Sequence, residues 1–262
     1  LTMWTATPLS LITKKERSIR SVIINQLVAR GFALIEVDDE KSSKALREGI
    51  EEARLLDGFR FPPINVDEIR YDQVHRDAFK TLFYTAVNCL SLLTNQDETD
   101  QIQFDRLFSD SANEPFPNDH LYHPTFFNLF NYNHGALNIH KDRGLVTVIH
   151  VDPPDLDPYE ASSIWIEGSD QKWRSGDAMI NQAKAEGSNK AFVLMLIGEE
   201  GETLFEDLGE LGLYSADHSV RVRPDGEYIE YSHYKRDPAS RETRNRLSAA
   251  LILQRKKTSD DI

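Results

Sequence analysis

The feature that most constrains the fold is a change in the pattern of the sequence after Thr125. From there, turn residues such as Gly, Pro and Asp separate short apolar segments, which cover 126–132, 145–151, 163–167, 191–197, 203–206, 219–223, 227–234 and 246–254. Apolar segments of this length between turn residues predict a series of short β-strands. A series of many short strands favours an antiparallel sandwich or barrel.

The first half of the chain has helical periodicity instead. Apolar residues recur at helical spacing in 14–30, 38–56 and 74–93, whereas 32–37 is short, apolar and partly β-branched and predicts a strand. Gly31 stands where a C-terminal cap would end the first helix. The apolar stripes of these helices are too one-sided to close a core among themselves, so we expect them to pack on the strand-rich half.

The order of these elements predicts an α+β fold in a single domain. Residues 1–124 would be a mainly helical support region, 125–254 the strand-rich core and 255–262 a polar tail. Within the support region, the prolines of 58–66 and the acidic, proline-containing stretch 95–124 indicate connecting loops.

Composition and charge narrow the classes of function. The formal charge of −13 disfavours nucleic acids and anionic membrane surfaces as partners, and no apolar run reaches the roughly 20 residues of a membrane span. The single cysteine, Cys89, lies in the helix expected at 74–93 and is expected as a buried structural thiol. No signal-peptide pattern is present, so we expect a cytoplasmic protein. We also expect a monomer or weak homodimer that acts on a small molecule.

A His and an Asp stand two residues apart just before the apolar segment 145–151. Residues i and i+2 of an extended strand point to the same side, so the His140 imidazole and the Asp142 carboxylate can converge on one point. These two groups and one further His form the facial triad that leaves open coordination positions on Fe(II). The pattern therefore predicts a metal site.

The remaining ligand has to come from a distant part of the chain. Closing a sheet into a double-layered roll brings separate strand ends together, and His218 stands at the start of the segment 219–223. His150 follows His140 by roughly ten residues, or ~33 Å of extended chain, which is too far for the same ion. We therefore select His218, with His134 as the next candidate.

A second motif lies on the last apolar segment, where Arg246 and Ser248 share one strand face. A guanidinium beside a hydroxyl is well suited to binding a carboxylate through charge-assisted hydrogen bonds. Arg-x-Ser is common by chance, so its weight comes from its position on the last strand.

Together these motifs resemble those of the non-haem Fe(II), 2-oxoglutarate-dependent oxygenases, in particular the branch similar to isopenicillin N synthase. The segment 140–148 resembles the family's His-Thr-Asp-x-Gly-Leu-Leu-Thr, Asn131-Tyr132 resembles its Asn-Tyr-Tyr stretch, and Gly31-Phe32 resembles its N-terminal Gly-Phe. The resemblance spans about 20–253. It implies a double-stranded β-helix, or jelly roll, with supporting N-terminal helices.

The resemblance also implies an activity. His140, Asp142 and His218 would hold Fe(II), 2-oxoglutarate would fill two of the three open positions, and O2 would take the last. Arg246 and Ser248 would hold the distal carboxylate of the cosubstrate, with Asn131 and Tyr132 nearby. The protein would then hydroxylate, desaturate or cyclise a small organic substrate and release succinate and CO2.

Two alternatives remain open. A non-haem iron oxidase that needs no 2-oxoglutarate would use Arg246 and Ser248 to bind a carboxylate of its substrate. A non-catalytic binding protein on an oxygenase scaffold belongs to another class, but it would have no reason to retain all three metal ligands.

The sequence also departs from the family. Ser219 stands where the family has Arg after the distal His, and Asn133 stands in place of its second Tyr. The polar segments 182–189 and 224–243 are longer than their family counterparts, and the second is expected as an inserted hairpin with Gly226 at its turn. Both insertions are expected near the substrate entrance, where they would influence specificity.

Overall fold

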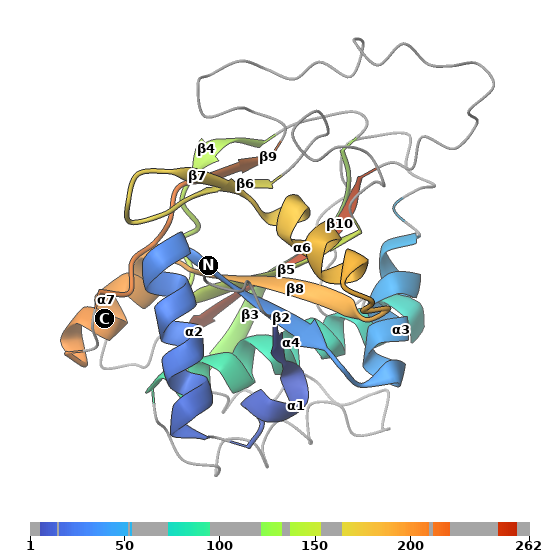
Figure 1. Ribbon diagram of the computed structural model, residues 1–262, viewed down its shortest axis with the longest axis horizontal. Helices are drawn as coiled ribbons and strands as arrows, with labels where there is room; N and C mark the ends of the chain where they lie inside the picture. Colours follow the sequence, from blue (N-terminus) through green and yellow to red (C-terminus); the bar gives the residue numbers. More distant parts are fainter. Residues whose placement is uncertain are drawn as a thin grey trace.

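Two β-sheets face each other, and helices cover the outer side of the larger one (Figure 1). The computed structural model describes residues 6–14, 16–51, 53, 73–94, 122–132, 137–152, 164–209, 212–220 and 246–255. Within these described residues, the strand pairs are antiparallel except β1 with β2. This arrangement confirms the expected α+β class.

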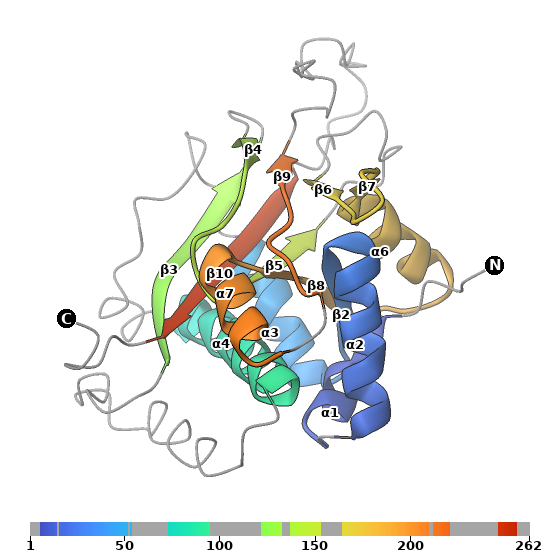
Figure 2. The same ribbon diagram turned by 90° about the vertical axis from the view of Figure 1, so that its left-hand side faces the viewer.

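The larger sheet has the order β1-β2-β8-β5-β10-β3, and the smaller sheet has the order β4-β9-β6-β7. In Figure 2, β4 and β9 of the smaller sheet lie side by side. The strands are β1 (Thr7–Pro8), β2 (Phe32–Val37), β3 (Tyr122–Asn131), β4 (Leu137–His140), β5 (Val146–Asp152), β6 (Ile164–Glu167), β7 (Trp173–Ser175), β8 (Ala191–Ile197), β9 (His218–Val220) and β10 (Leu247–Arg255).

Side chains of the larger sheet alternate between two cores. In β8, Val193 and Met195 face the helices, whereas Phe192 and Leu194 face the smaller sheet. All seven residues of β8 are buried. A strand that is covered on both faces needs apolar side chains at every position, which explains the uninterrupted apolar segment 191–197.

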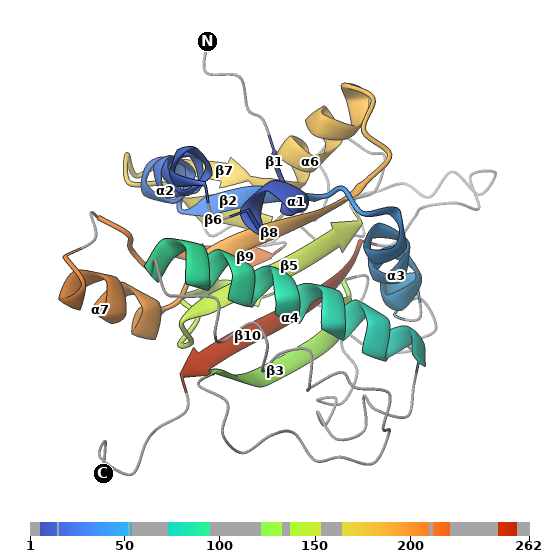
Figure 3. The ribbon, with the colours of Figure 1, turned by 90° about the horizontal axis from the view of Figure 1, so that it is seen from below.

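The helices form the outer layer, and α4 lies across β5 and β10 (Figure 3). Phe79 of α4 contacts Phe127 of β3 edge to face, with ring centroids 5.4 Å apart, which ties the helical layer to the sheet. The helices are α1 (Leu9–Ile12), α2 (Arg17–Arg30), α3 (Glu40–Glu51), α4 (Gln73–Thr94), α6 (Gly176–Ala185) and α7 (Glu199–Asp207).

Several local predictions are confirmed. Gly31 ends α2 with φ 80°, and its N–H donates to the Leu27 carbonyl at 2.8 Å. The strand predicted at 32–37 is β2, although it belongs to the larger sheet rather than to a separate support region. Cys89 is fully buried in α4, and burial raises the pKa of its thiol to about 12. The cysteine is therefore part of the core.

Other predictions are wrong or lie outside the described residues. The strand predicted at 203–206 is wrong, because this segment lies in α7. Acidic residues in the first turn of α7 complement the helix dipole. Of residues 203–206, Phe205 alone is fully buried. The polar segment 182–189 begins inside α6. A short apolar or polar run does not by itself distinguish helix from strand. The loop 58–66, the hairpin 224–243 and the strand 227–234 lie outside the described residues, as does most of 95–124.

His150 lies on the helix-facing side of β5, away from the smaller sheet. Its neighbours on that face, Val146 and Val148, belong to the core under the helices. Its Nδ1 lies 2.7 Å from the Phe192 carbonyl, and its Nε2 has no hydrogen-bond partner in the described part of the chain. Burial lowers the pKa of His150 from 6.5 to about 4, so the imidazole is neutral in the folded protein.

This burial predicts a specific loss of stability in acid. Below pH 6.5 the unfolded chain takes up a proton that folded His150 refuses until about pH 4, so the folded state weakens as the pH falls through this interval. His150→Leu removes this proton linkage. Urea unfolding at pH 7 and pH 5 should show that the wild type loses ~2 kcal/mol more than the variant. Parallel pH curves for the two proteins would contradict this account.

Candidate metal centre and adjoining cavity

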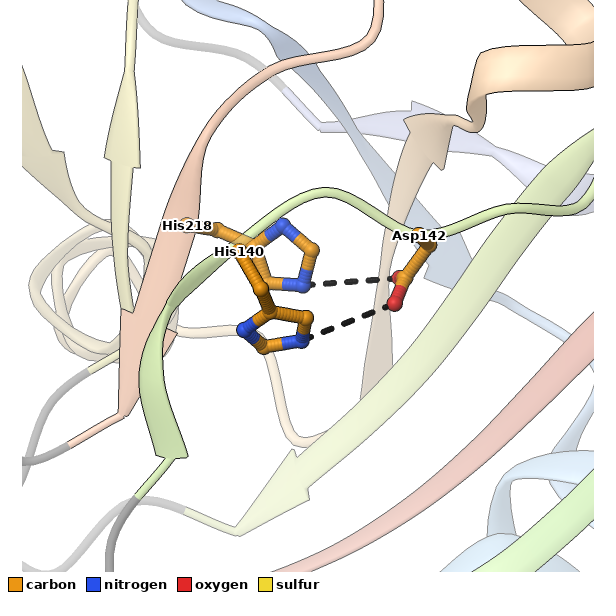
Figure 4. A group of neighbouring side chains, drawn as sticks. All are labelled: His140, Asp142 and His218. Carbon is orange, nitrogen blue, oxygen red and sulfur yellow. Dashed lines mark ion pairs between the residues drawn. The ribbon is translucent and has the colours of Figure 1, made fainter.

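Three potential metal ligands meet where β4 and β9 pair. His140 is the last residue of β4 and lies directly opposite His218, the first residue of β9, with ring centroids 4.3 Å apart. His140 Nε2 is 3.6 Å from Asp142 Oδ1, and His218 Nε2 is 3.4 Å from Asp142 Oδ2 (Figure 4). One ligand atom from each residue lies within 4.8 Å of the other two.

The structure brings His140 and Asp142 together for a different reason from the one that the sequence suggested. The two do not share a strand, because β4 ends at His140 and Asp142 lies in the turn before β5. This turn is held by the start of α7, where the N–H of Glu199 donates to the Asp142 carbonyl at 2.8 Å. A Cβ at Gly198 would lie 2.0 Å from the Gly144 carbonyl oxygen, so the backbones meet at van der Waals contact.

Backbone carbonyls orient both imidazoles. His140 Nδ1 lies 2.6 Å from the Asn138 carbonyl, and His218 Nδ1 lies 3.2 Å from the Ala216 carbonyl. A proton on each Nδ1 satisfies these contacts and leaves each Nε2 lone pair directed at the space beside Asp142. Burial lowers the pKa of His218, although the Asp142 charge opposes the shift, and neutral imidazole is the form that binds metals.

The donor set fits a first-row divalent ion. Two imidazole nitrogens and one carboxylate oxygen on one side of an ion are the ligands of non-haem Fe(II) sites, and they leave the other side open. His218 is buried, whereas His140 is partly exposed, so the group lies between the core and the protein surface.

A cavity of about 220 Å³ extends from this group between the two sheets. Its polar lining residues besides the three potential ligands are Tyr132, Thr147, Arg246 and Ser248, and its remaining lining is apolar. Thr147 Oγ1 and Arg246 Nη1 are buried and have no hydrogen-bond partner among the described residues. Buried polar atoms usually have a partner, so the cavity suits a polar ligand.

Arg246 lies in this cavity, but it already has a carboxylate partner. Its Nε donates to Asp177 Oδ2 at 2.7 Å, and its Nη2 donates to Asp177 Oδ1 at 3.0 Å. Burial would lower the pKa of Arg246, but the charge and hydrogen bonds of Asp177 raise it above the ordinary value. Nothing in the sequence indicated this ion pair, because its two members lie 69 residues apart.

Tyr132 and Ser248 lie on the cavity side, near the guanidinium of Arg246. Arg246 Cζ is 4.8 Å from the centre of the Tyr132 ring, within cation–π range. Burial raises the pKa of Tyr132 to about 12, so its hydroxyl keeps its proton and can donate a hydrogen bond. Ser248 is buried and lines the same cavity.

Asn131 is not brought to the cavity. It is buried at the end of β3, but strand alternation places Phe130 and Tyr132 on the cavity side and Asn131 on the side of Leu129, which packs under the helices. Asn131 is therefore removed from the group of candidate cosubstrate contacts. Of the alternative ligands, His134 lies outside the described residues.

Comparisons with known proteins find similarity at the level of structure alone. No protein-family model matches the sequence, and a search of curated proteins finds no match. Among solved structures, Neurospora crassa T7H in complex with alpha-KG has a TM-score of 0.53 at 11% identity, covering 97% of this chain and 85% of T7H. The chain has the fold of the 2-oxoglutarate oxygenases.

Two bacterial structures agree with this assignment of the fold. A protein from Caulobacter crescentus assigned to the 2OG-Fe(II) oxygenase family has a TM-score of 0.51 at 13% identity, covering 100% of this chain and 92% of that one. A protein from Shewanella oneidensis assigned as an oxygenase has a TM-score of 0.50 at 14% identity, with coverage of 96% and 90%. Neither structure singles out the isopenicillin N synthase-like branch, which stays a prediction.

Among the described residues, no helix is both long enough and apolar enough to cross a membrane.

The geometry predicts that the purified protein binds one Fe(II) or Mn(II). His218→Ala should abolish stoichiometric binding, because it removes one of three donors at a strand end without emptying the apolar core. Metal analysis after dialysis, with circular dichroism to verify folding, measures this. Asn138→Ala is the matched control, because Asn138 is exposed and only its backbone carbonyl contacts His140. Full metal content in the folded His218 variant would place the third ligand elsewhere.

Proposed function

We propose that the protein is an Fe(II)- and 2-oxoglutarate-dependent oxygenase that oxidises a small organic substrate, with His140, Asp142 and His218 as the metal ligands. The observation that carries this proposal is the convergence of two imidazoles and a carboxylate at one end of a cavity that also contains a buried arginine. We further propose that the two facing sheets are the halves of a double-stranded β-helix. The complex of T7H with alpha-KG is consistent with this cosubstrate.

Each group in the cavity has a proposed role. The two Nε2 atoms and the Asp142 carboxylate hold the ion, and the carbonyls of Asn138 and Ala216 keep the imidazoles aimed at it. Bound Fe(II) and 2-oxoglutarate would supply the oxidising chemistry, which ends in succinate, CO2 and an oxidised substrate. The apolar side chains from both sheets exclude water from the reacting centre.

The far end of the cavity would hold the distal carboxylate of the cosubstrate. Arg246 Nη1 is free of protein partners within the described residues, and the hydroxyls of Tyr132 and Ser248 lie beside it. A guanidinium nitrogen can only donate hydrogen bonds, and a hydroxyl can donate or accept them. A carboxylate needs donors, so these groups suit it.

The 2-oxoglutarate-independent oxidase remains a second candidate, and one observation favours it. Asp177 already neutralises Arg246, which reduces the attraction of the cavity for a dicarboxylate. In that case Arg246 and Ser248 would bind a carboxylate of the substrate. The charge of −13 also leads us to propose that the protein has no nucleic-acid or membrane partner. We further propose that it acts on a small molecule as a cytoplasmic monomer or weak homodimer.

Anaerobic addition of 2-oxoglutarate to the Fe(II)-loaded protein tests the proposal. The expected result is the visible charge-transfer absorption of a 2-oxo acid bound to Fe(II), followed by succinate formation when oxygen is admitted. Oxygen-dependent turnover of a substrate with neither the absorption band nor any need for 2-oxoglutarate would establish the oxidase instead.

Ser248→Ala tests the assignment of the anchor. The variant removes a hydrogen bond to a charged acceptor, worth ~1.5–3 kcal/mol, so the affinity for 2-oxoglutarate should fall by roughly ten- to a hundredfold while Fe(II) binding persists. Titrations with Fe(II) and with 2-oxoglutarate, followed by the absorption band, measure Fe(II) binding and the affinity for 2-oxoglutarate. Ser21→Ala, on the exposed face of α2, is the control. An unchanged affinity for 2-oxoglutarate would remove Ser248 from the anchor.

Arg246→Leu is a less suitable test of the anchor, because it leaves Asp177 buried without a counter-charge at a cost of ~3–5 kcal/mol.

A further inference from the structure

The arginine at the far end of the cavity is part of a buried, neutral pair. Arg246 is 1% exposed and Asp177 is 2% exposed, and both hydrogen bonds between them are short and well formed. The net charge of the pair is zero. An isolated arginine in the same place would be a buried positive charge that only an anionic ligand could compensate.

Asp177 is held in place by the helix that carries it. It lies in the first turn of α6, where Ser175 Oγ accepts a hydrogen bond from the Ala178 N–H at 3.0 Å. The N–H of Ile164 donates to Asp177 Oδ1 at 3.2 Å. Asp177 is therefore a fixed counter-ion rather than a side chain that a ligand easily displaces.

The backbone of α6 is also packed tightly at this point. A Cβ at Gly176 would lie 2.7 Å from Leu194 Cδ1 and 2.8 Å from Ile164 Cγ2, so the first turn rests directly on both sheets. Figure 1 shows α6 beside β6. This packing fixes the position of the backbone that carries Asp177 beside Arg246.

The arrangement divides the guanidinium into two edges. Asp177 occupies the edge formed by Nε and Nη2, while Nη1 has no hydrogen-bond partner in the described part of the chain. A ligand in the cavity would meet Nη1 together with the Tyr132 and Ser248 hydroxyls. The Tyr132 hydroxyl is itself hydrogen-bonded to Ser248 and Arg246, so the three groups form one polar cluster, and the net charge that the cluster presents with Asp177 is close to zero.

We propose that Asp177 is the residue that determines which 2-oxo acids the cavity accepts, an inference that rests on the proposed oxygenase function. By neutralising Arg246, Asp177 turns the far end of the cavity into a neutral polar site. A 2-oxo acid with an uncharged polar tail then competes with 2-oxoglutarate, because the attraction of Arg246 for the distal carboxylate is offset by the repulsion of Asp177 across the guanidinium.

The expected size of this effect follows from Coulomb's law. A unit charge one guanidinium away, at an effective dielectric constant of ~20, changes the affinity for a carboxylate by roughly ten- to a hundredfold. Specificity is a difference between two affinities, so this factor enters the preference for 2-oxoglutarate over an uncharged analogue directly.

Two variants separate the charge of Asp177 from that of Arg246. Asp177→Asn leaves Arg246 charged, so the cavity gains a net positive charge. The double variant Arg246→Gln with Asp177→Asn replaces the ion pair by two amides and keeps the net charge at zero, which also avoids an unpaired buried charge. Asp170→Asn is the matched control, since it breaks an Asp–Arg pair, with Arg174, that lies outside the cavity.

The measurement is the preference for 2-oxoglutarate over its 5-methyl ester, taken from anaerobic titrations of the absorption band in the Fe(II)-loaded proteins. The preference should rise by tenfold or more in Asp177→Asn, and should stay within about fivefold of the wild type in the double variant and in the control. In the metal-free proteins, glutarate should raise the melting temperature of Asp177→Asn more than that of the wild type.

Two results would overturn the inference. A preference that falls or stays unchanged in Asp177→Asn would make Asp177 a residue that positions Arg246 for the dicarboxylate. If the double variant prefers 2-oxoglutarate over the ester more than tenfold less than the wild type does, then Arg246 attracts the carboxylate despite Asp177. This second test holds even if Asp177→Asn does not fold. Failure of the proposed function is distinct, because then neither acid would give the absorption band in protein that binds iron.

Discussion

Burial of both faces of the six-stranded sheet is the constraint on which the rest of the structure depends. Each central strand contributes alternate side chains to two different cores, one under the helices and one facing the smaller sheet. In β10, Leu247 and Leu251 pack under the helices, whereas Ser248, and Arg246 just before the strand, face the cavity. A shift of one residue in the register would exchange these sets, placing a charged side chain among the helices. The hydrophobic core therefore fixes the direction of the polar cavity residues.

The two ends of the cavity are built from different elements. At one end, paired strand termini and a turn held by α7 gather His140, Asp142 and His218. At the other end, the last strand and the first turn of α6 bury Arg246 against Asp177. Asp142 is held through its backbone carbonyl, which accepts a hydrogen bond from the Glu199 N–H at the start of α7, and Asp177 lies in the first turn of α6. Small movements of these two helices would therefore affect both the potential metal ligands and the anchor.

The buried ion pair is the costly part of this design. Two charges lose their hydration, and their attraction offsets that cost only where geometry and hydrogen bonds are good, as in the two short contacts between Arg246 and Asp177. Removal of one partner leaves an unpaired buried charge. In an apolar cavity, the same low dielectric that strengthens the pair also makes the affinity for an ionic ligand depend strongly on every nearby charge.

The sequence by itself determined the elements with strong local signals. The helices α2 and α4 follow from apolar periodicity, the end of α2 follows from Gly31, and β8 follows from an uninterrupted apolar run. The closeness of His140 and Asp142 in the sequence and the strand-end position of His218 selected the three residues that meet in space, although Asp142 lies in the turn after β4 rather than on a shared strand. These features are local, or they depend only on strand ends that any roll of this kind brings together.

Only the tertiary structure decided how the cavity is completed. The turn that directs Asp142 depends on close backbone packing between Gly144 and Gly198, and the counter-ion of Arg246 comes from a helix 69 residues away. The exclusion of Asn131 from the cavity depends on the register of β3 with β10. Each of these features is a contact between segments whose own residues have no local preference for that contact. The features can therefore be recognised only once the packing of the two sheets and of α6 and α7 is known.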